Sequence, residues 1–198
     1  IQGKLLISTQ PSDVTAGASM SDVVVQVVDN SGTVISSAVD SVTVSIGTNG
    51  AASAGGVSAD LVGTTQVDAV SGESTFSGLQ FAKMGAGFTL SFTATNMVEV
   101  VVSATYTVNG VLAFTTAPST TLAGDSMAVV LEIRNDAGTK LADAGTTVTA
   151  LITTDGHASG SSGLTGGSAV AVAGTATFAL VINKNGAGFK LTFSGTAL

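Results

Sequence analysis

The chain has 198 residues, of which 10% are charged and 5% aromatic, and its 13 acidic and six basic residues give a formal net charge of −7. The basic residues nowhere form a cluster, which argues against nucleic acid as a partner. There is no cysteine, so neither disulfides nor thiolate metal sites hold the fold, and no apolar run approaches the roughly 18 residues that a membrane-spanning helix needs.

The first module is predicted to be a series of short strands, because apolar and polar residues alternate along it. The first three strands are expected at residues 5–8, 23–28 and 41–46, and in the third Ser41, Thr43 and Ser45 face outward. Residues 47–60 show no periodicity and are predicted to form a loop. Residues 65–70 and 73–77 are then expected to pair as a hairpin across Ser71-Gly72, with Phe76 inward.

Two further strands complete the first module. Gly85-Ala86-Gly87 is interpreted as a turn that leads into Phe88, Leu90 and Phe92, which alternate with hydroxyl residues. The last strand is expected at residues 98–108. Its core-facing side is predicted to carry Val98, Val100, Val102, Ala104 and Tyr106. About seven short strands at this spacing favour an antiparallel β-sandwich, and no helical periodicity competes with them.

At Gly110 the sequence begins a second time. Residues 110–124, GVLAFTTAPSTTLAG, match residues 3–17, GKLLISTQPSDVTAG, and the match includes the protein's two prolines, Pro11 and Pro118. A restart of this kind indicates tandem modules. We therefore predict one domain at residues 1–109 and a second at residues 110–198, each large enough for its own core.

The second module lacks a counterpart of the last strand. Its core residues Val129, Leu131 and Ile133 stand where the first module has valines, and Gly186-Ala187-Gly188-Phe189 repeats the earlier glycine segment. The sequence then stops at Leu198, before anything that would match residues 98–108. A sandwich without that strand exposes unpaired backbone groups and one side of its core. Two explanations stay open: the natural chain continues, or a neighbouring subunit donates the strand.

The repeated motifs resemble those of immunoglobulin-like modules found in tandem in large bacterial cell-surface and adhesin-type proteins. The resemblance rests on Thr-x-Pro-Ser followed by Ala-Gly, on the turns at residues 29–32 and 135–138, on the Gly-x-x-Thr-Phe segments and on the two Gly-Ala-Gly-Phe segments. It covers the whole chain except the missing strand. What it implies is an extracellular, cell-surface β-sandwich module without enzymatic activity.

Candidate catalytic residues are few. His157 is the only histidine and lies near Asp155 in a glycine- and serine-rich loop, where we expect a structural or solvated side chain. No Gly-x-Ser-x-Gly elbow occurs, and residues 160–163 are interpreted as a polar loop. The glycines at residues 85–87 and 186–188 precede strands, so no helix N-terminus is available there to bind phosphate. We predict no catalytic and no cofactor-binding residue.

Calcium is the one metal for which the sequence offers candidate ligands. Asp13, Asp29 and Asp125 are expected in turns near the sandwich ends, but no Asp-x-Asp-x-Asp loop is present, so turn formation is the preferred interpretation and no metal ligand is assigned. The outward row Ser41, Thr43 and Ser45 is likewise interpreted as ordinary strand chemistry, in preference to a glycan- or ice-binding face.

Two functions remain as hypotheses. The first is a non-enzymatic structural segment of a surface stalk, filament or surface layer, whose partners are copies of itself or further repeats and which assembles by β-strand complementation. The alternative is an adhesin-type module that recognises a glycan or surface protein through the loops at residues 47–60 or 154–167. The scarcity of aromatic rings argues against sugar binding.

Overall fold

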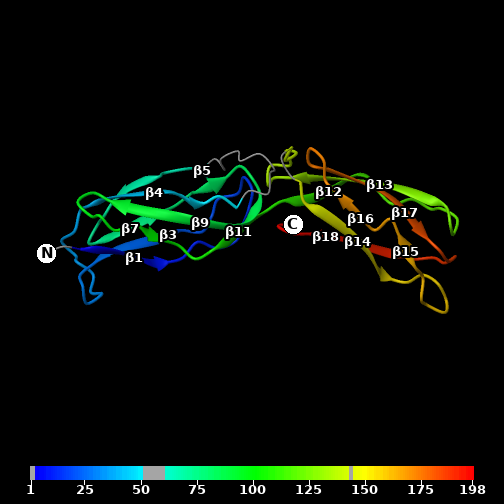
Figure 1. Ribbon diagram of the computed structural model, residues 1–198, viewed down its shortest axis with the longest axis horizontal. Coiled ribbons are helices and arrows are strands. Elements are labelled where there is room, and N and C mark those ends of the chain that lie inside the picture. The colour runs from blue at the N-terminus through cyan, green and yellow to red at the C-terminus, as the bar shows by residue number, and fades with distance from the viewer. Residues whose placement is uncertain (1–2, 51–60, 143–144) are drawn as a thin grey trace. The chain divides into compact units, whose positions relative to one another are not determined.

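The chain folds entirely into β-structure. A computed structural model describes residues 3–50, 61–142 and 145–198, and every regular element in these ranges is a strand (Figure 1). The described residues divide into two compact units at the Asn109–Gly110 bond. The predicted all-β class is confirmed. None of the described residues belongs to a helix that is long and apolar enough to cross a membrane.

Unit 1 is a sandwich of two principal sheets, and a short third pair of strands flanks them. All of its strand pairs are antiparallel except β2–β11. The first sheet has the order β1 (Lys4–Thr9), β3 (Val23–Val28), β7 (Glu73–Phe76). The second sheet has the order β2 (Val14–Thr15), β11 (Tyr106–Asn109), β9 (Gly85–Ala94), β4 (Ser41–Thr48), β6 (Gln66–Asp68). In this sheet β10 (Val101–Val102) also pairs with β9. The short third pair consists of β5 (Leu61–Val62) and β8 (Gln80–Phe81).

The core of unit 1 follows the alternation of the sequence. Successive side chains of a strand point to opposite faces, so the inward rows of β3, β4 and β9 meet between the sheets while Thr43 and Ser45 stay exposed. The inward rows are buried as predicted and consist of Val23, Val25, Val27, Val42, Val44, Phe88, Leu90 and Phe92, with Phe76 of β7 beside them. Phe76 and Phe92 pack with ring centroids 5.4 Å apart.

The predicted hairpin between residues 65–70 and 73–77 is wrong. β6 pairs with β4 and β7 pairs with β3, so the two strands belong to opposite sheets and share only the bridge between Val70 and Glu73. The backbone shows why they separate: Ala69 donates its N–H to Asp40, whereas the carbonyl of Gly72 accepts the N–H of Val27. The tight turn therefore connects the two sheets.

The predicted last strand is also different, because it is broken between β10 and β11. Ser103 at the break is buried, donates its N–H to the Leu90 carbonyl at 2.9 Å and accepts the Leu90 N–H with its hydroxyl at 2.9 Å. The break shifts the alternation by one residue. Tyr106 is buried as predicted, and so is Val108, whereas Val98, Val100, Val102 and Ala104, which were also expected in the core, are exposed.

Unit 2 repeats most of this plan. Leu112 of β12 faces Ile133 of β13 as Leu5 faces Val27, and Ile152 of β14 faces Leu191 of β18 as Ile46 faces Leu90. One sheet has the order β12 (Val111–Thr116), β13 (Ser126–Arg134), β17 (Thr175–Ile182), β15 (Leu164–Thr165). The other has the order β16 (Ser168–Val170), β14 (Thr147–Thr154), β18 (Lys190–Gly195).

The core of unit 2 is that predicted from the repeat. Val129, Leu131 and Ile133 of β13 are buried, and so is Phe178 of β17. The single strand β17 stands where unit 1 has both β7 and β8. Its residues 175–181 pair with β13, and Val181 and Ile182 at its end pair with β15. Within the described part of unit 2, no element takes the place of β2, β10 or β11. The second sandwich therefore lacks its last strand, as expected.

Candidate functional site at the open edge of unit 2

In unit 1 the edge of β9 is covered by β11. Tyr106 faces Phe88 and Thr107 faces Ala86, so Gly87 is skipped and forms a bulge. Its φ of +80° lies in the left-handed region, where a side chain would be strained. The interpretation of residues 85–87 as a turn before the strand is therefore wrong, because they lie inside β9 and carry the bulge.

The inward side chains of β11 complete the core. The ring of Tyr106 packs against those of Phe81 and Phe88 at centroid distances of 5.6 and 5.9 Å, and Val108 is fully buried. Burial raises the pKa of the Tyr106 phenol above its ordinary value, and its hydroxyl has no hydrogen-bond partner among the residues that the structure describes. Apolar packing therefore holds this ring in place.

Two side chains hold the backbone of this last segment. The carboxylate of Asp13 accepts the N–H of Thr107 at 2.7 Å, and the amide oxygen of Gln10 accepts the N–H of Ala104 at 2.9 Å. On the other edge of β11, β2 runs parallel to it and Ala16 donates its N–H to the Asn109 carbonyl. The interpretation of Asp13 as a turn residue is therefore wrong, since its carboxylate binds the last strand.

Asp29 is a turn residue, as predicted. Its carboxylate accepts hydrogen bonds from the hydroxyl and N–H of Ser31 and from the N–H of Thr33. The Ser31 hydroxyl, followed by these backbone N–H groups, lowers the pKa of Asp29 below its ordinary value. All three bonds go to Oδ1, so this oxygen of Asp29 is already used by the turn. Asp125 also lies in a turn, where its N–H bonds to the Leu122 carbonyl.

In unit 2 the corresponding edge of β18 is open. β18 pairs with β14, and no other strand of the described residues lies beside it. A groove of about 530 Å³ lies beside the start of β18 and is lined by residues 118–123, by residues 184–189 and by Met127, Ile182 and Leu191. Since residues 118–123 match residues 11–16 of unit 1, the groove lies where β11 lies in the first sandwich.

Side chains that the segment from β10 to β11 flanks in unit 1 have partly exposed counterparts in unit 2. Phe189, Leu191 and Phe193 are partly exposed, whereas Phe88, Leu90 and Phe92 are fully buried. Leu122, which matches Thr15 of β2, is 74% exposed. An apolar surface of this kind, next to unpaired backbone groups, is typical of a site that another segment covers.

One feature of the unit 1 edge recurs in unit 2. Gly188 has a φ of +80°, the value of the bulge residue Gly87. Ala187 donates its N–H to the carbonyl of Gly156, and a Cβ at Gly156 would collide with the Ala187 carbonyl. Residues 186–189 lie outside β18 and pair with no strand among the described residues, so Gly188 keeps the backbone conformation of Gly87 without a strand beside it.

The loop that contains His157 is built around Asp155. The carboxylate accepts the N–H of His157 at 2.9 Å, the N–H of Ser162 at 2.7 Å and the hydroxyl of Ser162 at 2.8 Å. These bonds, led by the Ser162 N–H, lower the pKa of Asp155. The His157 ring contacts the Asn185 carbonyl through Nδ1 at 2.6 Å. The polar groups of this loop thus fix its own backbone.

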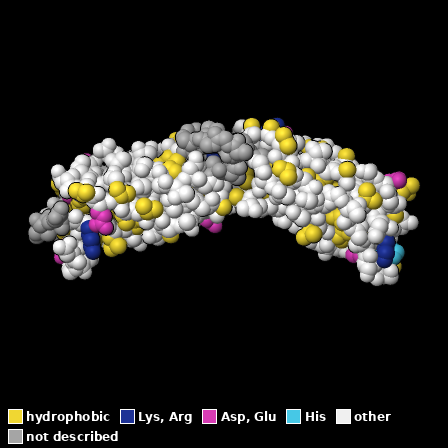
Figure 2. All heavy atoms as spheres, in the orientation of Figure 1, with side chains coloured by type: hydrophobic (Ala, Val, Ile, Leu, Met, Phe, Trp, Pro, Cys, Tyr) yellow, Lys and Arg dark blue, Asp and Glu magenta, His cyan; other side chains and the backbone are white. Residues whose placement is uncertain are grey.

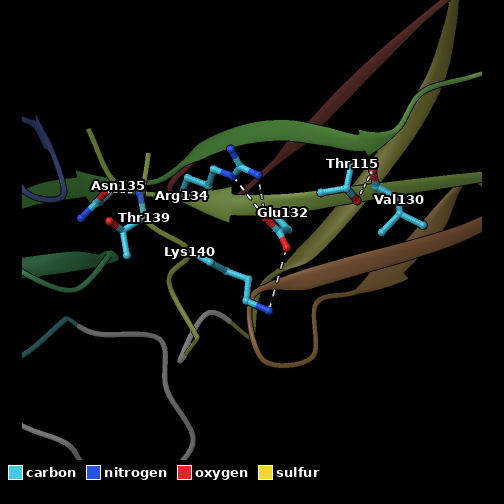
Figure 3. Close-up of polar contacts among 7 residues, drawn as sticks. All are labelled: Thr115, Val130, Glu132, Arg134, Asn135, Thr139 and Lys140. Carbon is cyan, nitrogen blue, oxygen red and sulfur yellow. Dashed lines mark hydrogen bonds and ion pairs between the residues drawn. The ribbon is translucent and has the colours of Figure 1, made fainter. Parts of the chain in front are cut away.

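Charged side chains elsewhere pair with each other. Glu132 on β13 lies 2.8 Å from Arg134 and 4.0 Å from Lys140, and Asn135 holds the adjoining turn by accepting the N–H of Thr139 (Figure 3). The face shown in Figure 2 carries few charged groups. Among the residues that the structure describes, no three His, Cys, Asp or Glu side chains gather where a metal ion could bind.

Sequence reasoning missed the role of Gln10 and Asp13. The signal was present in the repeat: the second module, which lacks the last strand, has Ala117 and Thr120 at these two positions. The acceptor side chains are therefore absent together with the strand that they bind in unit 1. The predicted loop at residues 47–60 falls mainly outside the described residues.

Comparisons with known proteins give distant likenesses in structure. No family model and no curated protein matches the chain. Among solved structures, the chain is similar to FdeC, an Escherichia coli adhesin, with 15% identity, a TM-score of 0.39 and coverage of 99% of this chain and 59% of that one. It is also similar to β-glucuronidase 3 of Bacteroides uniformis, with 14% identity, a TM-score of 0.28 and coverage of 98% of this chain and 23% of that one. A β-glucuronidase of Parabacteroides merdae is similar with 12% identity, a TM-score of 0.26 and coverage of 100% of this chain and 24% of that one. The chain thus spans 59% of the adhesin chain and about a quarter of the two enzymes.

Proposed function

We propose that the chain is a non-enzymatic, extracellular structural segment of a cell-surface stalk, filament or surface layer, and that it assembles with neighbouring modules through sheet edges. The observation that carries this proposal is the open groove beside β18, in the place that a strand fills in unit 1. An unpaired, apolar sheet edge is a template for another chain. A protein that retains such an edge is suited to assembly.

The surface composition supports the same proposal. Only 10% of residues are charged, and like-charge repulsion opposes close lateral packing of identical subunits. Ser and Thr side chains provide polarity without that repulsion. The repeated strand plan further suits a role in which modules extend a chain.

Immunogold labelling with antibodies raised against the purified chain tests this function. On intact cells of the source organism, we expect label on the outer surface or on material that extends from it. Preimmune antibody provides the control. Label that appears only after the cells have been permeabilised contradicts the proposal.

An adhesin-type binding module is the second candidate. The loop that follows β14 favours it, because Asp155 fixes this loop through three hydrogen bonds and Lys184 bonds to the carbonyl of Gly160. A loop ordered before binding loses less conformational entropy when a ligand binds. Arrays of glycans and surface proteins test this candidate. Binding that the Asp155→Ala variant loses supports it, whereas an array without binding removes it.

A further inference from the structure

We propose that the peptide Asn185-Gly186 is a site of intramolecular deamidation, which converts Asn185 into aspartate or isoaspartate without an enzyme. The sequence Asn-Gly occurs three times, at Asn49, Asn109 and Asn185. Asparagine is a chemically labile residue, and a glycine after it leaves the attacking backbone nitrogen unhindered because glycine has no side chain. The structure gives Asn185 and Asn109 opposite surroundings.

The reaction needs only the chain and water. The Gly186 nitrogen loses its proton and forms a bond to Cγ of Asn185, the bond from Cγ to Nδ2 breaks, and Nδ2 leaves with a proton as ammonia. Water then opens the succinimide ring at either carbonyl, which gives aspartate or isoaspartate. The rate rises with pH, since the nitrogen attacks in its deprotonated form.

Both groups that react at Asn185 are accessible. Asn185 and Gly186 are exposed and lie between β17 and β18, outside regular structure. Among the described residues, neither the Asn185 side chain nor the Gly186 N–H has a hydrogen-bond partner. No hydrogen bond therefore has to break before the nitrogen reacts. The fold also requires this glycine, because a Cβ at Gly186 would collide with the carbonyl of Gly156.

Asn109 is protected by the fold. It is the last residue of β11, and its carbonyl accepts the N–H of Ala16. Gly110 is buried, and its N–H donates to the Ala197 carbonyl at 2.8 Å. This nitrogen can attack only after the bond has opened. Asn109 therefore serves as a control within the same chain.

His157 activates the peptide bond between Asn185 and Gly186. Its Nδ1 lies 2.6 Å from the Asn185 carbonyl oxygen, and since a carbonyl only accepts hydrogen bonds, the ring is the donor. The bond draws electron density from the peptide unit that contains the Gly186 N–H, which makes this N–H easier to deprotonate. Asp155 accepts the backbone N–H of His157 at 2.9 Å and holds the residue in place. His157 is thus a positioning residue for the reaction.

The product changes the candidate site. Asn185 is one of the residues that line the groove beside β18, so deamidation adds a negative charge to this lining. Isoaspartate also lengthens the backbone shortly before the Ala187 N–H, which bonds to the Gly156 carbonyl, and should weaken that bond. This chemistry does not depend on the proposed function.

The test uses the unmodified full chain, incubated at mildly alkaline pH in water enriched in heavy oxygen. Each hydrolysed succinimide takes up labelled oxygen, so peptide mass spectrometry locates and quantifies the product. We expect Asn185 to deamidate at least about tenfold faster than Asn109, because only Asn109 needs a local opening. In concentrated urea the two rates should converge, since the fold no longer separates the two sites.

The variant His157→Phe tests the activation. It keeps a ring but removes the donor, so Asn185 should deamidate about two- to tenfold more slowly, as for the loss of one hydrogen bond, while Asn109 does not change. A loop that is merely loosened would react faster, so an unchanged or faster rate would overturn the role of His157. Equal rates at Asn185 and Asn109 in the folded chain, or no label at Asn185, would overturn the proposal itself.

Discussion

Phe88 and Phe189 occupy the same position in two copies of one plan, yet only the first is fully buried. Both follow a Gly-Ala-Gly segment with a left-handed last glycine. Phe88 lies within β9 and Phe189 directly precedes β18, and these two strands pair in the same register with β4 and β14. The difference is β11, which covers one residue and has no counterpart at the other. The inward rows and turns are therefore shared by the two units, and the burial of this phenylalanine depends on whether a strand lies beside it.

The comparison also shows which side chains bind the last strand of unit 1. Gln10 and Asp13 are at the surface, far from the last strand in sequence, and each accepts a backbone N–H from it. Unit 2 retains the proline of the same segment but not these acceptors. The segment after the first strand therefore has two roles, and unit 2 has kept only the turn.

The largest expected effect comes from the matched pair Phe88→Ala and Phe189→Ala. Removing the buried Phe88 ring should lower the free energy of unfolding of unit 1 by about 3–5 kcal/mol, whereas the partly exposed Phe189 should cost unit 2 about 1 kcal/mol. Urea unfolding followed by hydrogen exchange separates the two units. Equal losses would contradict the view that only Phe88 belongs to a closed core.

The next largest effect is expected for the variant Asp13→Ala. The variant leaves the Thr107 N–H without its acceptor, and we expect a loss of about 1–2 kcal/mol from the unfolding free energy of unit 1. Thr120→Ala, at the same place in unit 2, is the control and should change little. Faster exchange of the Thr107 amide identifies the cause. If both variants behave alike, Asp13 does not hold the strand.

Tyr106→Phe should act in the opposite direction. It removes a buried hydroxyl without a hydrogen-bond partner and keeps the ring that packs on Phe81 and Phe88. The expected result is unchanged or higher stability of unit 1, by up to about 1 kcal/mol. Thermal unfolding measures it, with Tyr106→Leu as the variant that should destabilise because it loses the ring contacts. A marked loss with Tyr106→Phe would show that the hydroxyl is bonded in solution.

The smallest expected effect is a difference in pH dependence between the turn at Asp29 and the matching turn at Asn135. Hydrogen bonds lower the folded pKa of Asp29 below its ordinary value of 3.8, so the carboxylate stabilises the turn above that value and loses this contribution as the pH falls through the folded pKa. Asn135 makes the equivalent bond to Thr139 with a neutral amide. Asp29→Asn should therefore change little at neutral pH and remove the acid dependence of the Thr33 amide in an NMR titration. An unchanged titration would show that another group governs the turn.

Much of the architecture could be predicted from local alternation. The rows of β3, β4 and β9 are buried as expected, because each strand has one face in a core and a one-residue slip would place the whole row in water. The repeat extended this prediction to β13 and β18 and located the missing strand. Partner choice between sheets is not local, so the segments around Ser71-Gly72 gave no sign that they belong to opposite sheets.

The last strand shows a second limit. Val98, Val100 and Val102 alternate as a core row should, yet they are exposed because Ser103 breaks the strand and shifts the alternation. A buried serine that bonds to a neighbouring strand leaves no pattern in the residues beside it. The sequence predicted the candidate site only as the place of a strand without a counterpart, whereas the groove beside β18 and the roles of Gln10 and Asp13 required the structure.

The parallel pairing of β2 with β11 has a mechanical consequence. The two strands lie near opposite ends of the unit 1 sequence and bond side by side. Tension that reaches these two strands pulls them past each other, so their hydrogen bonds must fail together before the segment between β2 and β11 lengthens. Unit 2 has no such clasp among its described residues, and under tension it should extend first unless a bound strand secures it.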